Sequence, residues 1–443
     1  MRRLAAALLA LLSGCASNGD LRGAAEAAGA FSPRRKGVGI EARIELGRLL
    51  FFDRELSGNR NVACASCHLP FHHAGDQLAL GRGQGAEGLG HERTGGPRLP
   101  RNTVEPFNRS FASALFWDGR VEERADGTIA APVPLPDGID TVLEAQALLP
   151  LLDRDEMRGE PGDVAVDGRP NELAALEGEA AVWAAVMDRL MAIEAYRRLF
   201  ASVFPDVPEG EHGIVHAARA IAEFEMFLWE LTDTRFDDYL GAVGTPPEDG
   251  ALVGPARRGA ALFFGAAGCA TCHDGPLLGG GRYANIGVPQ LGPGKDAATG
   301  LDEGRFLVTG DPADRFAFRV PPLRNVRLTG PYMHDGAYDT IEDAIRHHAD
   351  PEGMLRGYRG DRLSPDLRDQ VHRDPATIDA ILATLSPDLA AVPPLSDRDV
   401  HDLVSFLSAL TSDTERDVFP GAGVPPEVPS GLPVDTVVDG GRR

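Results

Sequence analysis

Two short motifs in this sequence carry the residue types needed for covalent haem attachment. They read Cys64-Ala-Ser-Cys67-His68 and Cys269-Ala-Thr-Cys272-His273. In the pattern C-x-x-C-H, two thiols add across the vinyl groups of a haem, and the adjacent histidine lies under the iron as an axial ligand. Only about 0.0015 such motifs are expected by chance at this composition, so two matches indicate two haem c groups.

A four-cysteine zinc site and a thioredoxin-like redox pair are the alternative uses of these cysteines. The cysteine pairs of such zinc sites are usually about 15–20 residues apart, whereas these two pairs are about 200 residues apart. A redox pair does not need the histidine that follows both motifs. Haem attachment is therefore the stronger interpretation.

Length and composition describe a folded, loop-rich chain with a strongly acidic surface. The 443 residues are enough for two or three domains, and 43% hydrophobic with 25% charged residues is ordinary for a globular protein. Gly 52 and Pro 34 indicate many loops. A net charge of −22 argues against nucleic acid as a partner and favours basic proteins or neutral small molecules.

The N-terminus has the pattern of a bacterial export signal. Met1-Arg2-Arg3 precedes a short apolar run that ends Leu12-Ser13-Gly14-Cys15, which is similar to a lipobox. We expect residues 1–14 to be removed, Cys15 to be lipidated and residues 15–37 to form a tether; an ordinary signal peptide is the alternative. The mature protein would then lie in the periplasm, held at a membrane, most simply the outer membrane, only through its lipid.

Apolar residues at helical spacing predict a mainly α-helical chain. A helix over 40–53 leads into the first motif, one over 256–267 leads into the second, and one over 401–411 closes the fold. Further helices are expected over 180–203 and 212–240, while strand-like alternation is scarce. Segments 121–143 and 413–443 are rich in Pro and Gly and are predicted to be a loop and a tail.

Several longer motifs make the chain resemble the bacterial di-haem cytochrome c peroxidases and their MauG-type relatives. The matching segments are Phe52-Asp-Arg-Glu-Leu-Ser-Gly-Asn-Arg-Asn-Val-Ala-Cys64, Arg101-Asn102 with Phe116-Trp117-Asp118-Gly119-Arg120, Gln146-Ala-Leu-Leu-Pro150 with Glu156-Met157, and Pro322-Leu-Arg-Asn325 with Leu328-Thr-Gly-Pro-Tyr-Met-His-Asp-Gly336. The resemblance implies two cytochrome c-like haem domains with a calcium site between them. Residues 38–175 would form the peroxidatic domain and 176–412 the electron-transfer domain.

The same resemblance assigns roles around the His68 haem. Glu156 is the expected acid/base, because a carboxylate can accept a proton as peroxide binds and return it as the O–O bond breaks. Gln146 and Pro150 accompany it, and Glu144 is the alternative carboxylate. Trp117 is the expected electron relay between the haems, whereas Trp183 and Trp229 are expected in the core. The loop histidines His72, His73 and His91 are expected to be solvated.

For the second haem, relatives carry a Met or a Tyr about 14 residues after the His of the Tyr-x-His-x-Gly motif. Counting from His334 leads to His348, which predicts bis-His ligation with His273. His347, the neighbour of His348, should project about 100° away and be solvated. Met354 is the alternative ligand. The role of His334 stays open, with a hydrogen bond at the lobe interface as one possibility.

The calcium site is implied by three positions, Asn102, Thr329 and Pro331, whose amide and carbonyl oxygens suit Ca²⁺. Between Arg120 and Gln146 the chain is about 19 residues longer than the family pattern leads us to expect, and we expect this insertion to reshape the mouth of the peroxide site.

The expected activity is reduction of hydrogen peroxide to water with electrons from a small cytochrome c or copper protein. An acidic surface fits a basic donor. MauG-like oxidation of a partner protein and a non-enzymatic electron-transfer cytochrome are the alternatives. Family members are often dimers, which makes a homodimer an expectation.

Overall fold

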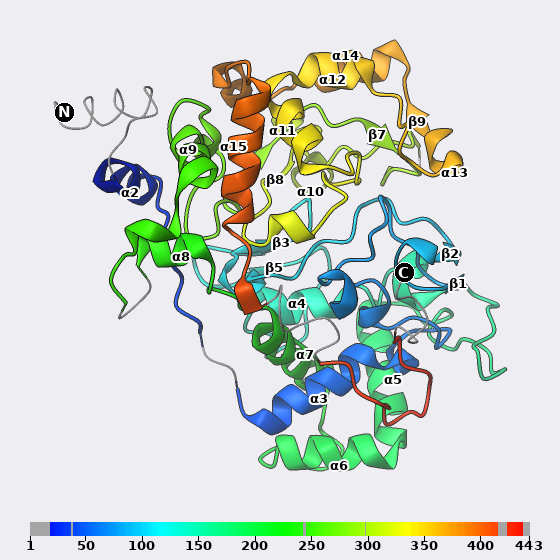
Figure 1. Ribbon diagram of the computed structural model, residues 1–443. Helices are drawn as coiled ribbons and strands as arrows, with labels where there is room; N and C mark the ends of the chain where they lie inside the picture. Colours follow the sequence, from blue (N-terminus) through cyan, green and yellow to red (C-terminus); the bar gives the residue numbers. More distant parts are fainter. Residues whose placement is uncertain (1–17, 37–38, 242–244, 297, 415–422, 437–443) are drawn as a thin grey trace.

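The computed structural model describes residues 18–36, 39–241, 245–296, 298–414 and 423–436. Helices dominate, and two large apolar cores lie in opposite parts of the molecule (Figure 1). We name the part around the first core, residues 41–231, the first lobe. The part around the second core, residues 18–30, 235–241 and 245–414, is the second lobe. Each lobe contains one C-x-x-C-H motif.

The first lobe is a helical core around α3 (Glu41–Phe52), which leads into the first motif as predicted. Helix α7 (Ile214–Trp229) packs on α3, and α5 (Glu179–Ala192) and α6 (Glu194–Val203) complete the core. Trp183 and Trp229 are buried in this core, as expected. The helix predicted over 180–203 is broken at Ile193, which is extended.

The domain boundary predicted between 175 and 176 precedes three helices, α5 to α7, that share one apolar core with α3. Cys64 packs against the same core, so we count these helices in the first lobe, while the bounds of the two functional domains stay a prediction. Local periodicity reveals these helices but not their partner. The predicted 212–240 helix likewise ends at Trp229, and α8 (Arg235–Leu240) begins beyond the break and packs in the second lobe.

The second lobe repeats this plan with α9 (Gly254–Phe263) before the second motif and α15 (Asp397–Ser408) packed across it. Helix α11 (Ile341–Ala349) lies beside α15 (Figure 1). The segment predicted to be a tether also belongs here. Helix α2 (Asn18–Ala27) buries Leu21 and Ala25 against this core, because these residues lie four apart on one helical face.

Both helix pairs cross at a glycine. A Cβ atom at Gly47 of α3 would lie 1.8 Å from the Ala220 carbonyl oxygen of α7, and one at Gly259 of α9 would lie 1.9 Å from the Asp402 carbonyl oxygen of α15. Because only glycine lets the backbones approach this closely, these two positions fix both crossings. The following phenylalanine in each lobe then reaches its haem-motif histidine, with ring centroids 6.5 Å apart for Phe51 and His68 and 6.4 Å for Phe263 and His273.

Strands are short, as the sequence predicts, and form small antiparallel sheets in the order β1-β2, β3-β4-β5, β6-β8 and β7-β9. Their bounds are β1 Ala86–Glu87, β2 Thr94–Gly95, β3 Ala114–Leu115, β4 Val121–Glu123, β5 Ile129–Ala130, β6 Tyr283–Ala284, β7 Gln290–Leu291, β8 Phe318–Arg319 and β9 Val371–His372. The remaining α-helices are α4 Val142–Leu148, α10 Phe306–Thr309, α12 Pro351–Gly357, α13 Pro365–Arg368 and α14 Pro375–Leu382.

The 121–143 segment is not simply a loop. Strands β4 and β5 form a hairpin that packs with β3 and α4 in a separate apolar cluster, which includes Val121, Ile129 and Leu143. Hydrophobic residues between the prolines and glycines supply this packing.

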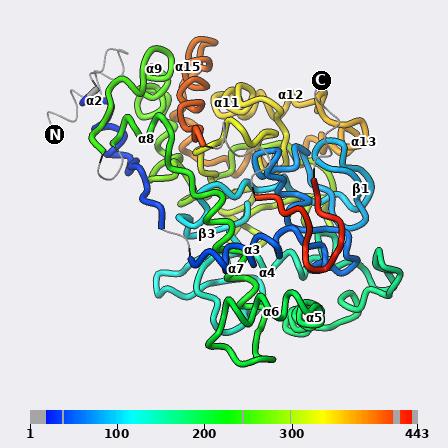
Figure 2. Tube along the Cα trace, turned by 60° about the horizontal axis from the view of Figure 1, so that its bottom comes forward, coloured from blue at the N-terminus to red at the C-terminus, as the bar shows by residue number. Residues whose placement is uncertain are grey.

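The C-terminal segment 423–436 returns to the first lobe, where it runs along α3 (Figure 2). Val428 is buried in the first core, and Ser430 donates to Asp53 at 2.6 Å. The buried Asp435 accepts from Ser66, inside the first haem motif, at 2.5 Å and pairs with Arg54. The predicted tail is therefore in part a strap over the first motif.

Within the described ranges, no helix has the length and apolar character needed to cross a bilayer. Cys15 and the signal segment 1–14 lie outside the described residues.

The close crossing of α9 and α15 predicts an unusual cost for a small substitution. Gly259→Ala places a methyl group against a backbone carbonyl, so we expect a loss of about 1–3 kcal/mol in the free energy of unfolding. Gly23→Ala in α2 is the control, because its Cβ meets nothing within 4 Å, and a gain of about 0.5–1 kcal/mol is expected there. Denaturant midpoints measure both. Equal midpoints for wild type and Gly259→Ala would contradict the crossing.

Candidate active site

Each haem motif lines its own large cavity. The first cavity is lined by Cys64, Cys67 and His68 together with Trp117, Gln146 and Glu156. Its empty space is about 1280 Å³, and that of the second cavity, lined by Cys269, Cys272 and His273, is about 1600 Å³, solvent at the mouths included. Because the cysteine pairs line different cavities, they do not form a single zinc site.

The motif histidines are prepared to bind a metal through Nε2. Nδ1 of His68 lies 3.2 Å from the Ala74 carbonyl oxygen, and Nδ1 of His273 lies 3.2 Å from that of Leu278. A carbonyl at Nδ1 keeps the proton there and leaves the Nε2 lone pair free. Burial lowers the pKa of both histidines to about 4, so each is neutral at pH 7. Both cavities thus fit a haem attached at the motif.

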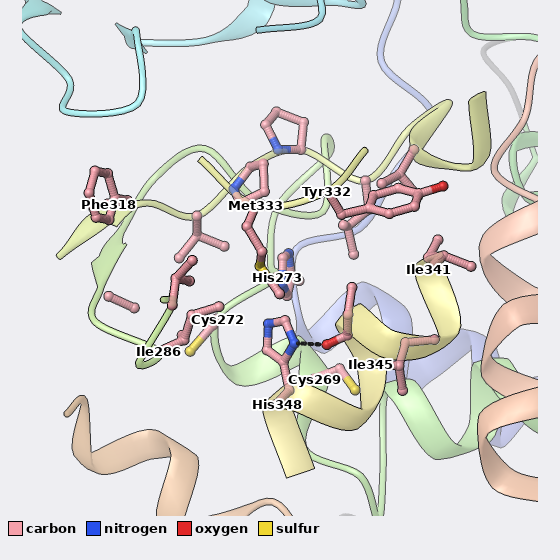
Figure 3. A pocket seen from close by; sticks show the side chains of 18 of the residues that line it. Cys269, Cys272, His273, Ile286, Phe318, Tyr332, Met333, Ile341, Ile345 and His348 are labelled. Carbon is pink, nitrogen blue, oxygen red and sulfur yellow. Dashed lines mark hydrogen bonds between the residues drawn. The ribbon is translucent and has the colours of Figure 1, made fainter. Parts of the chain in front are cut away.

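His348 faces His273 across the second cavity (Figure 3). The two ring centroids are 6.2 Å apart. Nδ1 of His348 lies 2.8 Å from the Ala344 carbonyl oxygen one helical turn earlier, so its Nε2 is also free. The structure therefore places two neutral imidazoles on opposite sides of one cavity, which is the arrangement that bis-His ligation requires.

The neighbouring candidates do not share this geometry. His347, predicted to be solvated, is instead fully buried, with Nδ1 2.9 Å from the Tyr338 hydroxyl and Nε2 2.7 Å from the Ile286 carbonyl oxygen. Ile286 lies 61 residues earlier in the chain, and helical periodicity does not reveal a contact over that distance. Met354 lies in α12 and packs in a cluster with Tyr358; this cluster borders the second cavity through Ile286, Val288 and Met333, but Met354 itself is not among the residues that line the cavity.

Glu156 reaches the first cavity from a single π-helical turn, Arg154–Arg158. Asp153 caps this turn by accepting from the backbone N–H groups of Asp155 and Glu156. Gly83 allows a neighbouring segment to close against the turn, since a Cβ there would lie 1.8 Å from the Asp155 carbonyl oxygen. π-turns of this kind are frequent at functional sites, and this one holds the carboxyl group in place.

The surroundings give Glu156 a pKa near neutrality. Burial and the charge of Asp153 raise the pKa of this carboxyl group to about 7, while Arg120 and Lys295 oppose the rise. A group with this pKa can both accept and donate a proton at pH 7. Gln146, from the last turn of α4, lines the same cavity beside it.

The other sequence candidates lie elsewhere. Glu144 bonds the backbone N–H of Asp140 at 2.7 Å and the Arg219 guanidinium at 3.3 Å, and it does not line the cavity. His72, His73 and His91 are also outside the lining residues. Within the predicted insertion between Arg120 and Gln146, Leu143 lines the first cavity, while Val121 and Ile129 pack in the neighbouring apolar cluster, so an effect of the insertion on the cavity mouth stays a prediction.

Trp117 is a wall of both cavities. It is 7% exposed, and its Nε1 donates to the Asn102 carbonyl oxygen at 3.0 Å. Its own carbonyl oxygen accepts from the backbone N–H of Arg319, in the second lobe, at 2.7 Å. Trp117 is thus held by both lobes, through its indole in the first and its backbone in the second, and it lies between the two cavities.

The residues predicted to bind calcium also meet at this interface. Asn102, Thr329 and Pro331 line the second cavity. The side-chain amide of Asn102 donates to the Leu78 carbonyl oxygen at 2.7 Å. The backbone N–H of Asn102 donates to the carbonyl oxygen of His334, also at 2.7 Å. His334 is buried and stacks on Phe318, with ring centroids 3.5 Å apart. Its backbone thus joins the two lobes, whereas among the described residues no hydrogen-bond partner meets the buried Nδ1 of its side chain.

Sequence reasoning missed the cations of the site. Lys295 comes from the second lobe and lines the first cavity, and Arg109 and Arg319 line the first and the second cavity respectively. One available signal is that Lys295 is one of only two lysines among the 44 basic side chains of Lys and Arg. The closeness of these residues to the motifs is decided by tertiary contacts.

Comparisons with known proteins agree on one family. Residues 41–243 match the family described as di-haem cytochrome c peroxidase. The chain is 30% identical over 352 residues to the methylamine utilization protein MauG of Methylorubrum extorquens, covering 79% of this chain and 80% of that protein. It is 32% identical over 302 residues to the cytochrome c551 peroxidase of Nitrosomonas europaea, covering 68% and 71%.

Solved structures show the same likeness. A MauG-like protein associated with microbial copper homeostasis matches with a TM-score of 0.58 and 26% identity, covering 89% of this chain and 96% of that one. The diheme peroxidase BthA of Burkholderia thailandensis has the same fold, with a TM-score of 0.58 and 21% identity, covering 87% and 89%.

The pKa of Glu156 predicts the pH dependence of the reaction with peroxide. A base must be ionised to accept a proton, so the second-order rate constant should fall as the pH drops below about 7. Glu156→Gln should remove this limb and slow the reaction by about 10²-fold or more with both haems still attached. Stopped-flow rates from pH 5 to 9 measure the effect. Glu144→Gln is the control that should keep the wild-type profile, and an unaltered rate in Glu156→Gln would remove Glu156 from the reaction.

The facing imidazoles predict the spectra of the second haem. His348→Ala should abolish the low-spin bis-His signal in low-temperature EPR, whereas Met354→Ala should leave it unchanged. Near-infrared magnetic circular dichroism tests the alternative. A His/Met band that survives in His348→Ala and disappears in Met354→Ala would reject His348 as the ligand.

Proposed function

The chain belongs to the di-haem cytochrome c peroxidase family, and on this premise we propose that it reduces hydrogen peroxide to water with electrons from a small cytochrome c or copper protein. It is an oxidoreductase, and membership of the family implies two c-type haems. The observation that carries the proposal is the difference between the two cavities. One holds a carboxyl group with a pKa near 7, and the other holds a second imidazole.

We assign the first cavity to peroxide and the second to electron storage. His68 and His273 would be the proximal ligands, and Cys64, Cys67, Cys269 and Cys272 the attachment points. His348, which faces His273, would be the second imidazole that holds a haem in the second cavity and would leave no side of that haem open to substrate. In the first cavity no histidine among the lining residues faces His68, which leaves one side for peroxide. When bound, the haem iron supplies the site at which peroxide is held and reduced.

The chain's own residues then transfer the protons and orient the peroxide. With a haem held at His68, ionised Glu156 would accept a proton from peroxide and return it to the oxygen that leaves as water when the O–O bond breaks. The amide of Gln146 orients the peroxide by hydrogen bonding. Overall, one hydrogen peroxide, two protons and two electrons give two waters, and each one-electron donor is oxidised once. Trp117 relays electrons between the cavities.

A calcium ion at Asn102, Thr329 and Pro331 is part of the proposal. The side-chain nitrogen of Asn102 donates to the carbonyl oxygens of Leu78 and Ala79, and among the described residues no hydrogen-bond donor meets its Oδ1. This oxygen, with backbone carbonyls of Thr329 and Pro331, matches the ligands that Ca²⁺ prefers. The ion would stiffen the segment between Trp117 and the second cavity.

MauG-like oxidation of a partner protein is the second candidate. The likeness to MauG over four-fifths of that protein's length favours it, as does the position of Trp117 between the cavities. We further propose a periplasmic location with two cytochrome c-like domains, and homodimer formation as in many relatives. The acidic net charge of −22 favours a basic donor.

One experiment separates the candidate functions. The protein is reduced anaerobically, mixed with peroxide and followed by optical and EPR spectroscopy, and steady turnover with reduced cytochrome c is then measured. Sustained oxidation of the donor supports the peroxidase. Reaction with peroxide but no turnover of any small donor favours oxidation of a partner protein. A lack of reaction with peroxide supports an electron-transfer cytochrome and rejects the proposal.

The lipid anchor is tested by Cys15→Ser. Since the lipid on Cys15 is the only proposed anchor, this variant should appear in the soluble periplasmic fraction with its peroxidase activity intact. Fractionation followed by haem staining measures it. Membrane association that persists in the variant would disprove lipidation at Cys15.

A further inference from the structure

Two buried arginines between the cavities have guanidinium nitrogens without partners. Arg109 of the first lobe is 4% exposed and Arg319 of the second lobe is 1% exposed. Nη1 of Arg109 and both Nη atoms of Arg319 are buried, and among the described residues no hydrogen-bond acceptor meets them. A buried N–H group without an acceptor is costly, and a buried cation without a counter-ion is more so.

The other donors of both side chains are fixed, so the guanidinium groups cannot turn away. Nε of Arg109 donates to the Glu105 carbonyl oxygen at 2.8 Å, and its Nη2 donates to the Glu105 carboxylate. Nε of Arg319 donates to the Phe116 carbonyl oxygen at 2.9 Å. Its backbone N–H bonds the carbonyl of Trp117 at 2.7 Å. Arg319 is therefore attached to the segment that carries the indole.

The free N–H groups belong to residues that line the two cavities. Arg109 lines the first cavity, Arg319 lines the second, and Glu105 lines both. Burial and the charge of Arg109 lower the pKa of Arg319 to about 9, and Glu105 only partly opposes this. One carboxylate between two guanidinium groups leaves the cluster with an excess of positive charge. Anions bound in the cavities would therefore stabilise this cluster by neutralising its charge and accepting its free N–H groups.

We propose that Arg109 binds a propionate carboxylate of the haem in the first cavity and that Arg319 binds one of the haem in the second. Each haem c carries two propionates, and a guanidinium fork matches a carboxylate with two parallel hydrogen bonds. The inference rests on haem attachment at the two motifs and not on the reaction with peroxide. The two arginines hold the propionate edges of both haems toward Trp117. Their positive charge stabilises the reduced form of each haem.

The test uses the loaded protein, with two attached haems verified by mass spectrometry. Arg319→Gln removes the cation at the second haem and Arg109→Gln the one at the first. Arg282→Gln is the control, because this exposed arginine lies beside the second motif and bonds the Thr271 carbonyl oxygen. Arg319→Lys keeps the charge but loses the fork. Optical redox titration gives the ferrous-to-ferric ratio of each haem, and resonance Raman spectra give the propionate bending bands.

In Arg319→Gln we expect the ferrous-to-ferric ratio of the second haem to fall at least tenfold at fixed potential, which equals 59 mV for one electron. Its propionate bands should shift, while the first haem stays unchanged. Arg109→Gln should instead lower the ratio and shift the propionate bands of the first haem while the second haem stays unchanged. Arg319→Lys should change the second haem less than Arg319→Gln does, and Arg282→Gln should change neither haem. Propionate bands and ratios at the wild-type values in both Gln variants would overturn the proposal.

A crystal structure of the loaded wild-type protein decides the matter even if a variant fails to fold. Propionate oxygens within hydrogen-bond distance of Arg109 Nη1 and the Arg319 Nη atoms would support the inference. Propionates bonded only to other groups would reject it. Neither measurement uses peroxide, so a failure of the proposed peroxidase function would leave this result readable.

Discussion

A buried ion bridge joins the two lobes and fixes the position of the two cavities relative to each other. Arg101 pairs with Asp118 of the first lobe at 2.6 Å and, through two nitrogens, with Asp302 of the second lobe at 2.6 and 2.9 Å. Burial alone would raise the pKa of Asp118, but Arg101 and Arg120 outweigh it and hold the pKa well below its usual range. Removing one partner of such a bridge leaves a buried charge uncompensated, at a typical cost of about 3–5 kcal/mol. Trp117, which lines both cavities, directly precedes Asp118 in the chain, so the bridge anchors the segment that carries it.

The two lobes use one scaffold for two purposes. In both, a glycine brings two helices together, a phenylalanine reaches the motif histidine, and a backbone carbonyl fixes the Nδ1 proton. The difference lies on the opposite wall of each cavity. A π-turn presents the carboxyl group of Glu156 in the first, and helix α11 presents the imidazole of His348 in the second. The proposed division between substrate chemistry and electron storage therefore rests on the residues of this one wall in each cavity.

The electrostatics of the first cavity are shared between the lobes. Burial raises the pKa of Glu156, and part of the opposing positive charge comes from Lys295 of the second lobe. The acid strength of the proposed catalytic group therefore depends on how the lobes are docked. Arg98 and Arg82 of the first lobe both pair with Asp366 of the second lobe and add a further contact between the lobes. The fold thereby links the chemistry of one cavity to the position of the other lobe.

Local sequence determined the haem motifs, the helices that precede them, the scarcity of strands and the family to which the chain belongs. These features depend on short spacings and on helical periodicity, which a single segment carries by itself. The same counting led from His334 to His348, and the structure places that side chain opposite His273. Tertiary structure alone decided which segments pack together. Helices α5 to α7 join the first lobe, α2 covers the second, and Asp435 returns to the first motif, because apolar faces and carboxylates find partners hundreds of residues away. It also decided that His347 is buried and that Arg109 and Arg319 meet between the cavities. Burial and charge at these positions are properties of the assembled interface, and no local pattern in the chain records them.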